Sequence, residues 1–229
     1  MINTPIKSEH QNSLRHTPTW VFDLDNTLYS GVHGLFEQID MRMRQYLAKY
    51  LDVSEDQAHK VQKGYFKQYG TTLRGMMLNH NMDPGPYLDY VHDIDISTIP
   101  PSPQLSAALH QLSGRKLIFT NSDMAHVERT LNRLGIADHF DGVFDIADAD
   151  FIPKPEPEVY DKLVKRFGFD PTQAVMVEDI ARNLAPAAAL GMTTVWVRPI
   201  TDCDICKEDP EGDHVDIQTD NLVTWLESL

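Results

Sequence analysis

Apolar and polar positions along the chain form two kinds of pattern. The run 19–24 (TWVFDL) is short, apolar and rich in β-favouring side chains, which predicts a buried strand. From about residue 35 to 92, apolar residues recur at helical spacing and no strand pattern interrupts them. We therefore expect an all-helical unit there, with helices along 36–50 and near 56–69, 72–80 and 86–92.

After the proline-rich break at 100–103 the pattern alternates between helix and strand. Helices are expected near 104–112, 124–134, 158–167, 184–190 and 222–226, and strands near 116–119, 143–146, 174–177, 193–197 and 215–217. This alternation predicts an α/β fold, with a doubly wound (Rossmann-like) parallel sheet covered by helices on both faces. The expected core domain is 18–30 plus 98–229, the helical domain 31–97 is inserted into it, and the polar residues 1–17 form a flexible tail.

Composition and charge make some classes of partner and location less plausible. The chain has 229 residues and a formal net charge of −14, which disfavours nucleic acid and anionic membranes as partners. We see no apolar run long enough to cross a bilayer and no signal peptide at the N-terminus, so a cytoplasmic location is expected. The two cysteines, Cys203 and Cys206, resemble half of a zinc site, but the surrounding acidic residues favour a solvated loop.

Chemically active residues follow the predicted strands. In open parallel sheets, ligands bind beyond the carboxyl ends of the strands. The residues expected at that edge are Asp23 and Asp25 after the first strand, Thr120, Asn121 and Ser122 after the second, Lys154 after the third, and Glu178 and Asp179 after the fourth. Four carboxylates in one pocket repel one another unless a cation lies among them, and an all-oxygen ligand set suits Mg²⁺.

Each of these signals also has a simpler explanation. An Asp-x-Asp after a strand is often a turn or a helix N-cap, and Glu178-Asp179 could cap the next helix. Lys154 alone would be read as a solvated lysine. Taken together and in this order, they favour phosphoryl transfer to a carboxylate nucleophile, with a second carboxylate as acid and base.

The same residues resemble a known family. Asp23-Leu24-Asp25-Asn26-Thr27, Thr120, Lys154 and Glu178-Asp179 are similar, in order and spacing, to the four motifs of the haloacid-dehalogenase-like phosphohydrolases. The resemblance extends over residues 20–228, and the helical insert lies where that superfamily has its cap. Dehalogenases of the superfamily lack the second acid, because halide leaves without a proton, so Asp25 favours phosphate-ester hydrolysis.

The resemblance implies a role for each motif residue. Asp23 is the expected nucleophile and a Mg²⁺ ligand. Asp25 is the expected acid and base, and it also binds the metal through its carbonyl. The remaining assignments are Thr120, Asn121 and Ser122 to the phosphoryl oxygens, Lys154 to charge compensation at the reacting centre, Asp179 with Glu178 to the metal, and Asn183 to support of Lys154 or of the loop after the second strand.

Further stretches look like the pyrimidine 5′-nucleotidase branch, namely 25–29 (DNTLY), 69–75 (YGTTLRG), 89–95 (DYVHDID), 119–122 (FTNS) and 177–184 (VEDIARNL). This resemblance implies UMP or CMP as substrate, and Arg74, between two glycines, as a substrate contact. Glu37, Arg44, His80 and His92 more simply form charged helix faces. The alternatives are a phosphatase for another small metabolite, a phosphotransferase or mutase, and a non-catalytic binding protein on the same fold.

Overall fold

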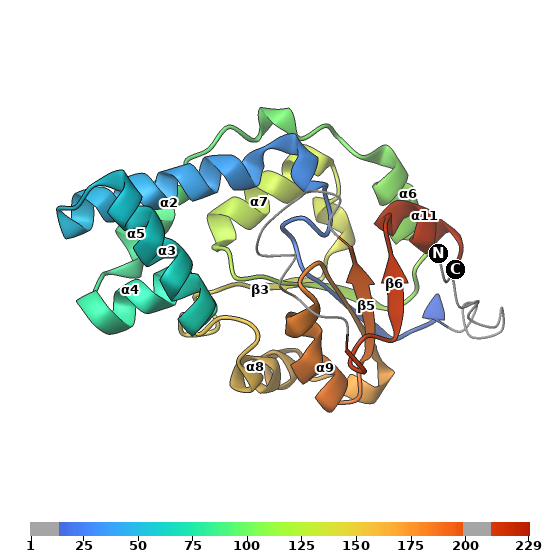
Figure 1. Ribbon diagram of the computed structural model, residues 1–229. Helices are drawn as coiled ribbons and strands as arrows, with labels where there is room; N and C mark the ends of the chain where they lie inside the picture. Colours follow the sequence, from blue (N-terminus) through green and yellow to red (C-terminus); the bar gives the residue numbers. More distant parts are fainter. Residues whose placement is uncertain (1–13, 199–211) are drawn as a thin grey trace.

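The computed structural model describes residues 14–198 and 212–229. Its centre is a six-stranded sheet in the order β3-β2-β1-β4-β5-β6, in which every neighbouring pair is parallel (Figure 1). The strands are β1 (Thr19–Phe22), β2 (Arg115–Phe119), β3 (Gly142–Phe144), β4 (Ala174–Glu178), β5 (Thr193–Val197) and β6 (Ile217–Thr219). The parallel α/β fold predicted from the alternating pattern is confirmed.

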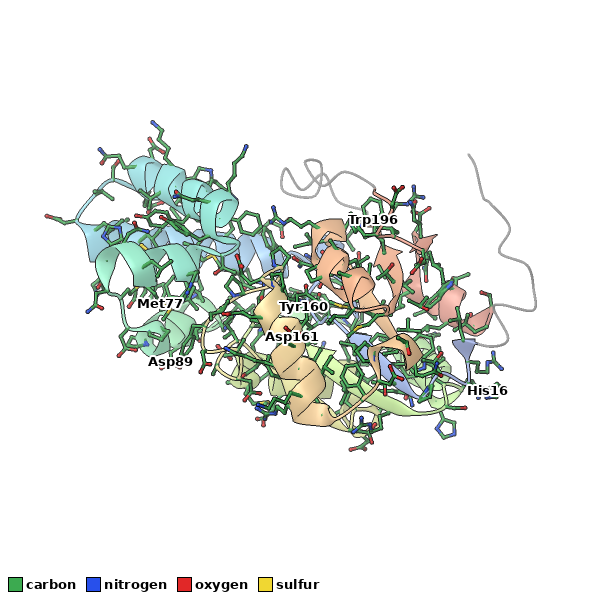
Figure 2. All side chains as sticks on the ribbon, turned by 90° about the horizontal axis from the view of Figure 1, so that it is seen from below. His16, Met77, Asp89, Tyr160, Asp161 and Trp196 are labelled. Atoms are coloured by element: carbon green, nitrogen blue, oxygen red, sulfur yellow. The ribbon has the colours of Figure 1, made fainter. Side chains whose placement is uncertain are left out.

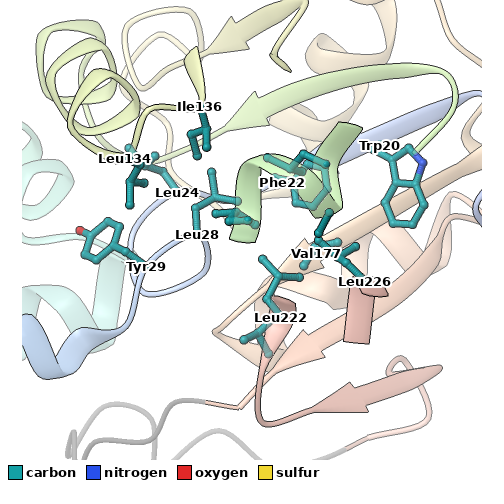
Figure 3. Close-up of a cluster of buried hydrophobic side chains, with 14 of the residues drawn as sticks. Trp20, Phe22, Leu24, Leu28, Tyr29, Leu134, Ile136, Val177, Leu222 and Leu226 are labelled. Atoms are coloured by element: carbon teal, nitrogen blue, oxygen red, sulfur yellow. The ribbon is translucent and has the colours of Figure 1, made fainter. Parts of the chain in front are cut away.

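Helices cover both faces of the sheet (Figure 1). They are α6 (Pro103–His110), α7 (Met124–Leu134), α8 (Pro157–Phe167), α9 (Ala185–Ala189) and α11 (Leu222–Glu227). Along β1, Trp20 and Phe22 point to the face covered by α6, α7 and α11, whereas Val21 points to the face covered by α8 and α9. Figure 3 shows the first of these cores, where Phe22 and Val177 lie near Leu222 and Leu226 of α11. Because both faces are buried, the strands are almost continuously apolar.

Between β1 and α6 the chain forms the helices α2 (Leu35–Leu51), α3 (Glu55–Tyr69), α4 (Thr72–His80) and α5 (Pro84–Val91). They pack around a core of their own that includes Leu47, Met76 and Tyr87. Figure 2 shows Met77 of α4 and Asp89 of α5 at the end of the molecule opposite His16. We call residues 31–97, with these four helices, the cap. Within the described part of the chain, no helix is long and apolar enough to cross a membrane.

Several element boundaries differ from the sequence expectation. β1 ends at Phe22 rather than residue 24, because a turn begins at Leu24. The carbonyl of Leu24 accepts a hydrogen bond from the amide of Leu28 (3.0 Å). β3 ends at Phe144, since the carbonyl of Asp145 accepts the amide of Ala149 and the chain turns. β6 begins at Ile217 rather than residue 215. The predicted helix at 184–190 is a 3₁₀ turn (Ala181–Leu184) followed by the short α9.

The predicted tail lies mostly outside the described residues, as do Cys203 and Cys206. Of its described part, Arg15 accepts a hydrogen bond from the amide of Ser113 through its carbonyl (2.9 Å). Residues 14–17 therefore contact the turn that precedes β2.

The contact between α3 and α4 gives a first prediction. A Cβ placed on the buried Gly75 would lie 2.3 Å from Cγ of Tyr65, near the rigid base of that side chain. We expect Gly75→Ala to lower the free energy of unfolding by about 1–3 kcal/mol, because the two helices would have to separate. At Gly64, on α3, an added Cβ would meet no described atom within 4 Å beyond the adjacent backbone of its own helix, so Gly64→Ala should raise the free energy of unfolding by about 0.5–1 kcal/mol. Urea unfolding of both variants measures the difference, and equal effects would contradict the prediction.

Candidate active site

The candidate site lies where the middle strands end. β1 lies between β2 and β4, so the residues that follow these three strands meet at one edge of the sheet. Asp23 still donates its amide to the carbonyl of Val177 on β4 (2.9 Å), after which the chain turns away. The structure thus brings Asp23 and Asp25 beside the ends of β2 and β4, in one pocket.

Lys154 is the centre of the site. It comes from the loop between β3 and α8, and its side chain is 2% exposed. Its Nζ donates to Oδ1 of Asp23 (2.7 Å), Oε2 of Glu178 (2.5 Å) and the carbonyl of Phe119 (3.0 Å). The hydroxyl of Thr27 donates to the other oxygen of Asp23 (3.0 Å). These contacts hold the Asp23 carboxylate in one orientation.

The buried carboxylates of this cluster repel one another, and their pKa values are shifted as a result. Burial, together with the carboxylates of Glu178 and Asp25, raises the pKa of Asp23 to about 7 against the lowering effect of Lys154. Burial and Glu178 also raise the pKa of Asp179 well above its usual range. Burial alone would lower the pKa of Lys154. The carboxylates of Asp23 and Glu178 have a larger effect in the opposite direction and raise the pKa above its usual value, so the ammonium group stays charged.

Asp25 has a different environment. Oδ1 accepts hydrogen bonds from the hydroxyl of Tyr29 (2.5 Å) and contacts Nε2 of His126 (2.8 Å), while Oδ2 accepts from the hydroxyl of Ser122 (2.7 Å). Burial raises the pKa of Asp25, but His126, Tyr29 and Ser122 outweigh it and hold the pKa well below its usual range. Asp23 and Asp25 therefore have pKa values shifted in opposite directions, and Asp25 is an unprotonated carboxylate in this arrangement.

Sequence reasoning did not assign His126 to the site. It lies in the first turn of α7, which begins directly after the Thr120–Ser122 loop. Its position so soon after Ser122 in the sequence could have indicated that it lies close to the site. Its ring stacks on His92 of the cap, with ring centroids 4.7 Å apart. His92 also contacts Asp123 through Nδ1 (2.5 Å). This group of residues joins the end of α5 to the start of α7.

The loop after β2 is shaped by its own side chains. The amide of Ser122 donates to the hydroxyl oxygen of Thr120 (3.0 Å), and the amide of Lys154 donates to Oδ1 of Asn121 (2.9 Å). Asn121 thus supports the Lys154 loop directly. Asn183, expected to support Lys154 or this loop, lines the same pocket, and its carbonyl accepts the hydroxyl of Tyr160 (2.5 Å).

The pocket continues from the sheet edge into the cap. Its cap side is mainly apolar, with Phe36, Met43 and Phe66 among the lining residues. Arg74 is half-buried on α4 and is not among the described residues that line the pocket, so the structure gives no support to it as a substrate contact. The cations that do line it, besides Lys154, include Lys63 and Arg182.

Residues 18–191 match the model of the haloacid dehalogenase-like hydrolases, which covers both the sheet edge and the cap. The chain belongs to this family. The match includes Asp23, Asp25, Lys154 and Asp179, the residues that the structure gathers in one pocket.

Two curated relatives of this haloacid dehalogenase-like hydrolase are similar over most of its length. The chain is 30% identical over 193 residues to phosphate metabolism protein 8 of Saccharomyces cerevisiae, a match that covers 75% of the chain and 58% of the yeast protein. It is 28% identical over 193 residues to a glyceraldehyde 3-phosphate phosphatase of Methanopyrus kandleri, covering 78% and 82% of the two chains. The chain thus spans less than two thirds of the yeast relative.

Solved structures of the family share the fold. The HAD-hydrolase YfnB of Bacillus subtilis, bound to magnesium, superposes with a TM-score of 0.60 at 15% identity, covering 93% of this chain and 98% of that one. A HAD phosphatase of Thermococcus onnurineus superposes with a TM-score of 0.58 at 21% identity, covering 88% and 92%. At these identities the likeness concerns the fold alone.

The donor set of this hydrolase suits a divalent cation. Asp23, Glu178 and Asp179 are all buried and each offers a carboxylate oxygen within 4.8 Å of the others. Against three potential negative charges, Lys154 supplies one positive charge, and the raised pKa values of Asp23 and Asp179 reflect that imbalance. Hard oxygen ligands of this kind are the ones that Mg²⁺ prefers.

Proposed function

We propose that this protein is a Mg²⁺-dependent phosphomonoester hydrolase that acts through an aspartyl-phosphate on Asp23. The observation that carries the proposal is the buried contact of Lys154 with both Asp23 and Glu178, in a pocket that also holds Asp25 and Asp179. A protein that only binds a phosphorylated ligand does not need a nucleophilic carboxylate such as Asp23 next to a second carboxylate such as Asp25. The names of the relatives, which include glyceraldehyde 3-phosphate and fructose-1-phosphate phosphatases, support a phosphatase.

In the first half-reaction, a carboxylate oxygen of Asp23 forms a bond to phosphorus as the ester P–O bond breaks. Lys154 stays charged and orients Asp23 while it offsets charge on the phosphoryl group. We assign to Asp25 the proton that the leaving oxygen takes. Because Asp25 is an unprotonated carboxylate in the present arrangement, it must first take up a proton and exchange one of its hydrogen bonds, to Tyr29 or Ser122, for the substrate. Asp23, Asp25 and Asp179, with Glu178 beside them, would hold Mg²⁺, and the bound ion would supply positive charge near the phosphoryl group.

In the second half-reaction, water attacks phosphorus and Asp25 accepts its proton, so that phosphate leaves and Asp23 is regenerated. We assign Thr120, the amide of Asn121 and Ser122 to the phosphoryl oxygens, because they border the pocket next to Asp23. Asn183 supports the same edge. Residues 31–97 act as a cap on the core formed by 18–30 and 98–229, and exclude water from the closed pocket.

For the substrate we propose a pyrimidine nucleoside 5′-monophosphate, on the basis of the nucleotidase-like stretches around Tyr29, Gly70 and Asp89. The apolar lining of the cap suits a ring with two apolar faces. A small sugar phosphate is the second candidate, favoured by the names of the relatives.

A panel of phosphomonoesters tests the proposal. We expect phosphate release with Mg²⁺ and none with EDTA, and the highest kcat/KM with UMP or CMP among UMP, CMP, AMP, GMP, glyceraldehyde 3-phosphate and fructose 1-phosphate. Highest activity with a sugar phosphate would retain the mechanism and reject the nucleotide. No release from any ester by folded, Mg²⁺-loaded protein would contradict the proposed function.

A further inference from the structure

Two polar side chains on the cap wall of the pocket have buried groups without a partner. Gln62 on α3 is 2% exposed and Tyr87 on α5 is 1% exposed, and both line the pocket that contains Asp23. Oε1 of Gln62 and the hydroxyl of Tyr87 have no hydrogen-bond partner among the described residues. A buried polar group left unpaired costs about 1–3 kcal/mol, so two such groups in one pocket need an explanation.

The orientation of the Gln62 amide follows from its neighbours. Nε2 donates to Oδ1 of Asp40 (2.9 Å) and to the Asp40 carbonyl (3.3 Å), and both of these oxygens only accept. Lys63 donates to the same Asp40 carboxylate oxygen (2.7 Å) and holds it in place. The NH₂ end of Gln62 is therefore committed to Asp40, which leaves Oε1 as a fixed acceptor.

Tyr87 supplies the complementary group. Burial, with smaller effects of Tyr46 and Asp40, raises the pKa of Tyr87, so its hydroxyl keeps its proton and can donate. Its ring is held edge-on against Tyr46, with centroids 5.3 Å apart and planes at 86°. Gln62, Tyr87 and Asp40 line the same pocket, so the free acceptor and the free donor belong to one region of the cap.

We propose that Gln62 and Tyr87 bind the polar edge of a nucleobase and so determine which phosphomonoester the enzyme accepts. This inference rests on the proposed function and specifies its substrate class. Gln62 Oε1 would accept an N–H of the base, and the Tyr87 hydroxyl would donate to an adjacent carbonyl or ring nitrogen. Uracil presents an imide N–H beside a carbonyl, and cytosine an amino group beside a ring nitrogen.

The surroundings favour a base over a sugar at this place. Phe36, Ile39, Met43 and Phe66 line the same pocket, and they match the apolar faces of a planar ring. The guanidinium of Arg182 lies 4.9 Å from the centroid of the Phe66 ring, which keeps that ring oriented. A sugar would bring hydroxyls on all sides into this apolar wall, where many would lose their hydrogen bonds to water.

Tyr87→Phe tests the inference because it removes only the hydroxyl. We expect kcat/KM for UMP to fall about 10-fold, mainly through KM, which is the effect of losing one buried hydrogen bond to a substrate. Hydrolysis of phenyl phosphate, whose ring has no polar edge, should change less than about 2-fold because none of its interactions depends on the hydroxyl. The melting temperature should stay the same or rise, since an unpaired buried hydroxyl disappears. A merely structural role for Tyr87 would instead affect both substrates and lower the melting temperature.

Two further measurements complete the test. Tyr90→Phe is the matched control, because Tyr90 is a partly exposed cap tyrosine whose hydroxyl contacts Gln45, and it should leave UMP kinetics unchanged. Uridine, which has no phosphate, should compete with phenyl phosphate in the wild type and the Tyr90→Phe variant, and at least about 5-fold more weakly in Tyr87→Phe and Gln62→Met, as expected for one lost hydrogen bond.

The outcomes separate the inference from the proposed function. Phosphate release from esters without any effect of Tyr87→Phe on UMP, or without inhibition by uridine, would overturn the inference and leave the phosphatase intact. Binding of uridine in a calorimeter, weakened by Tyr87→Phe, with no hydrolysis of any ester, would support the base site and reject the phosphatase.

Discussion

Asp23→Asn is expected to reduce phosphate release by about 10⁴-fold or more, because a neutral amide cannot form the covalent bond to phosphorus. The exchange conserves volume, and Glu178 remains as an anionic partner for Lys154. It also removes one carboxylate from a cluster in which the negative charges repel one another, as the raised pKa of Asp23 indicates. We therefore expect a folded protein with a melting temperature close to that of the wild type.

The comparison variant is Asp170→Asn. Asp170 is an exposed residue that accepts hydrogen bonds from Thr172 at the start of a short 3₁₀ turn, and it is not among the described residues that line the pocket. Its replacement should leave phosphate release unchanged. Initial rates for both variants, prepared without contact with wild-type enzyme, provide the measurement. Activity of Asp23→Asn above about one tenth of wild type would contradict nucleophilic catalysis by this residue, because removal of a nucleophile costs far more.

Lys154→Met is expected to have the largest effect on stability. It leaves Asp23 and Glu178 buried without their shared cation, and breaking a buried ion pair in this way costs about 3–5 kcal/mol. For a chain of this size, the melting temperature should fall by about 10 °C. Phosphate release should also be lost, since nothing then orients Asp23 or offsets charge on the phosphoryl group.

Lys162→Met is the matched control, since it removes a lysine from an exposed pair. Nζ of Lys162 lies 2.9 Å from Asp150, and the two side chains are 36% and 78% exposed. Such a pair contributes less than about 1 kcal/mol, because water already solvates both charges. Thermal unfolding of the two variants in EDTA provides the comparison. Equal melting temperatures would show that burial of Lys154 does not make its ion pairs important for stability.

Much of the architecture could be read from the sequence, because the periodicity of apolar residues changes from strand to helix along the chain. The apolar run ending at Phe22 predicted a central buried strand, and the later alternation predicted the parallel sheet. The prediction failed at the strand end, since a run of side chains does not show where backbone hydrogen bonding stops. There Asn26 adopts a positive φ of 61° in the turn after β1.

The candidate site could likewise be predicted only in part from the sequence. That Asp23, Lys154 and Asp179 should meet followed from the sequence, because parallel strands all end at one edge of their sheet. The contact of Asn121 with Lys154, and that of His126 with Asp25, did not follow. Each depends on how a helix or loop is rotated and on which rotamer a side chain adopts, and distance along the chain carries neither piece of information.

By itself, then, the sequence determined the order of strands and helices, the family and the group of acidic residues with one lysine, since these depend on local patterns and on the edge that parallel strands share. Only the tertiary structure decided which cap side chains reach the pocket. It left Arg74 out and brought in Gln62 and Tyr87, which lie on different helices. Their position depends on how α3 and α5 pack against α2, and that packing is settled by side-chain contacts between distant segments rather than by any local pattern.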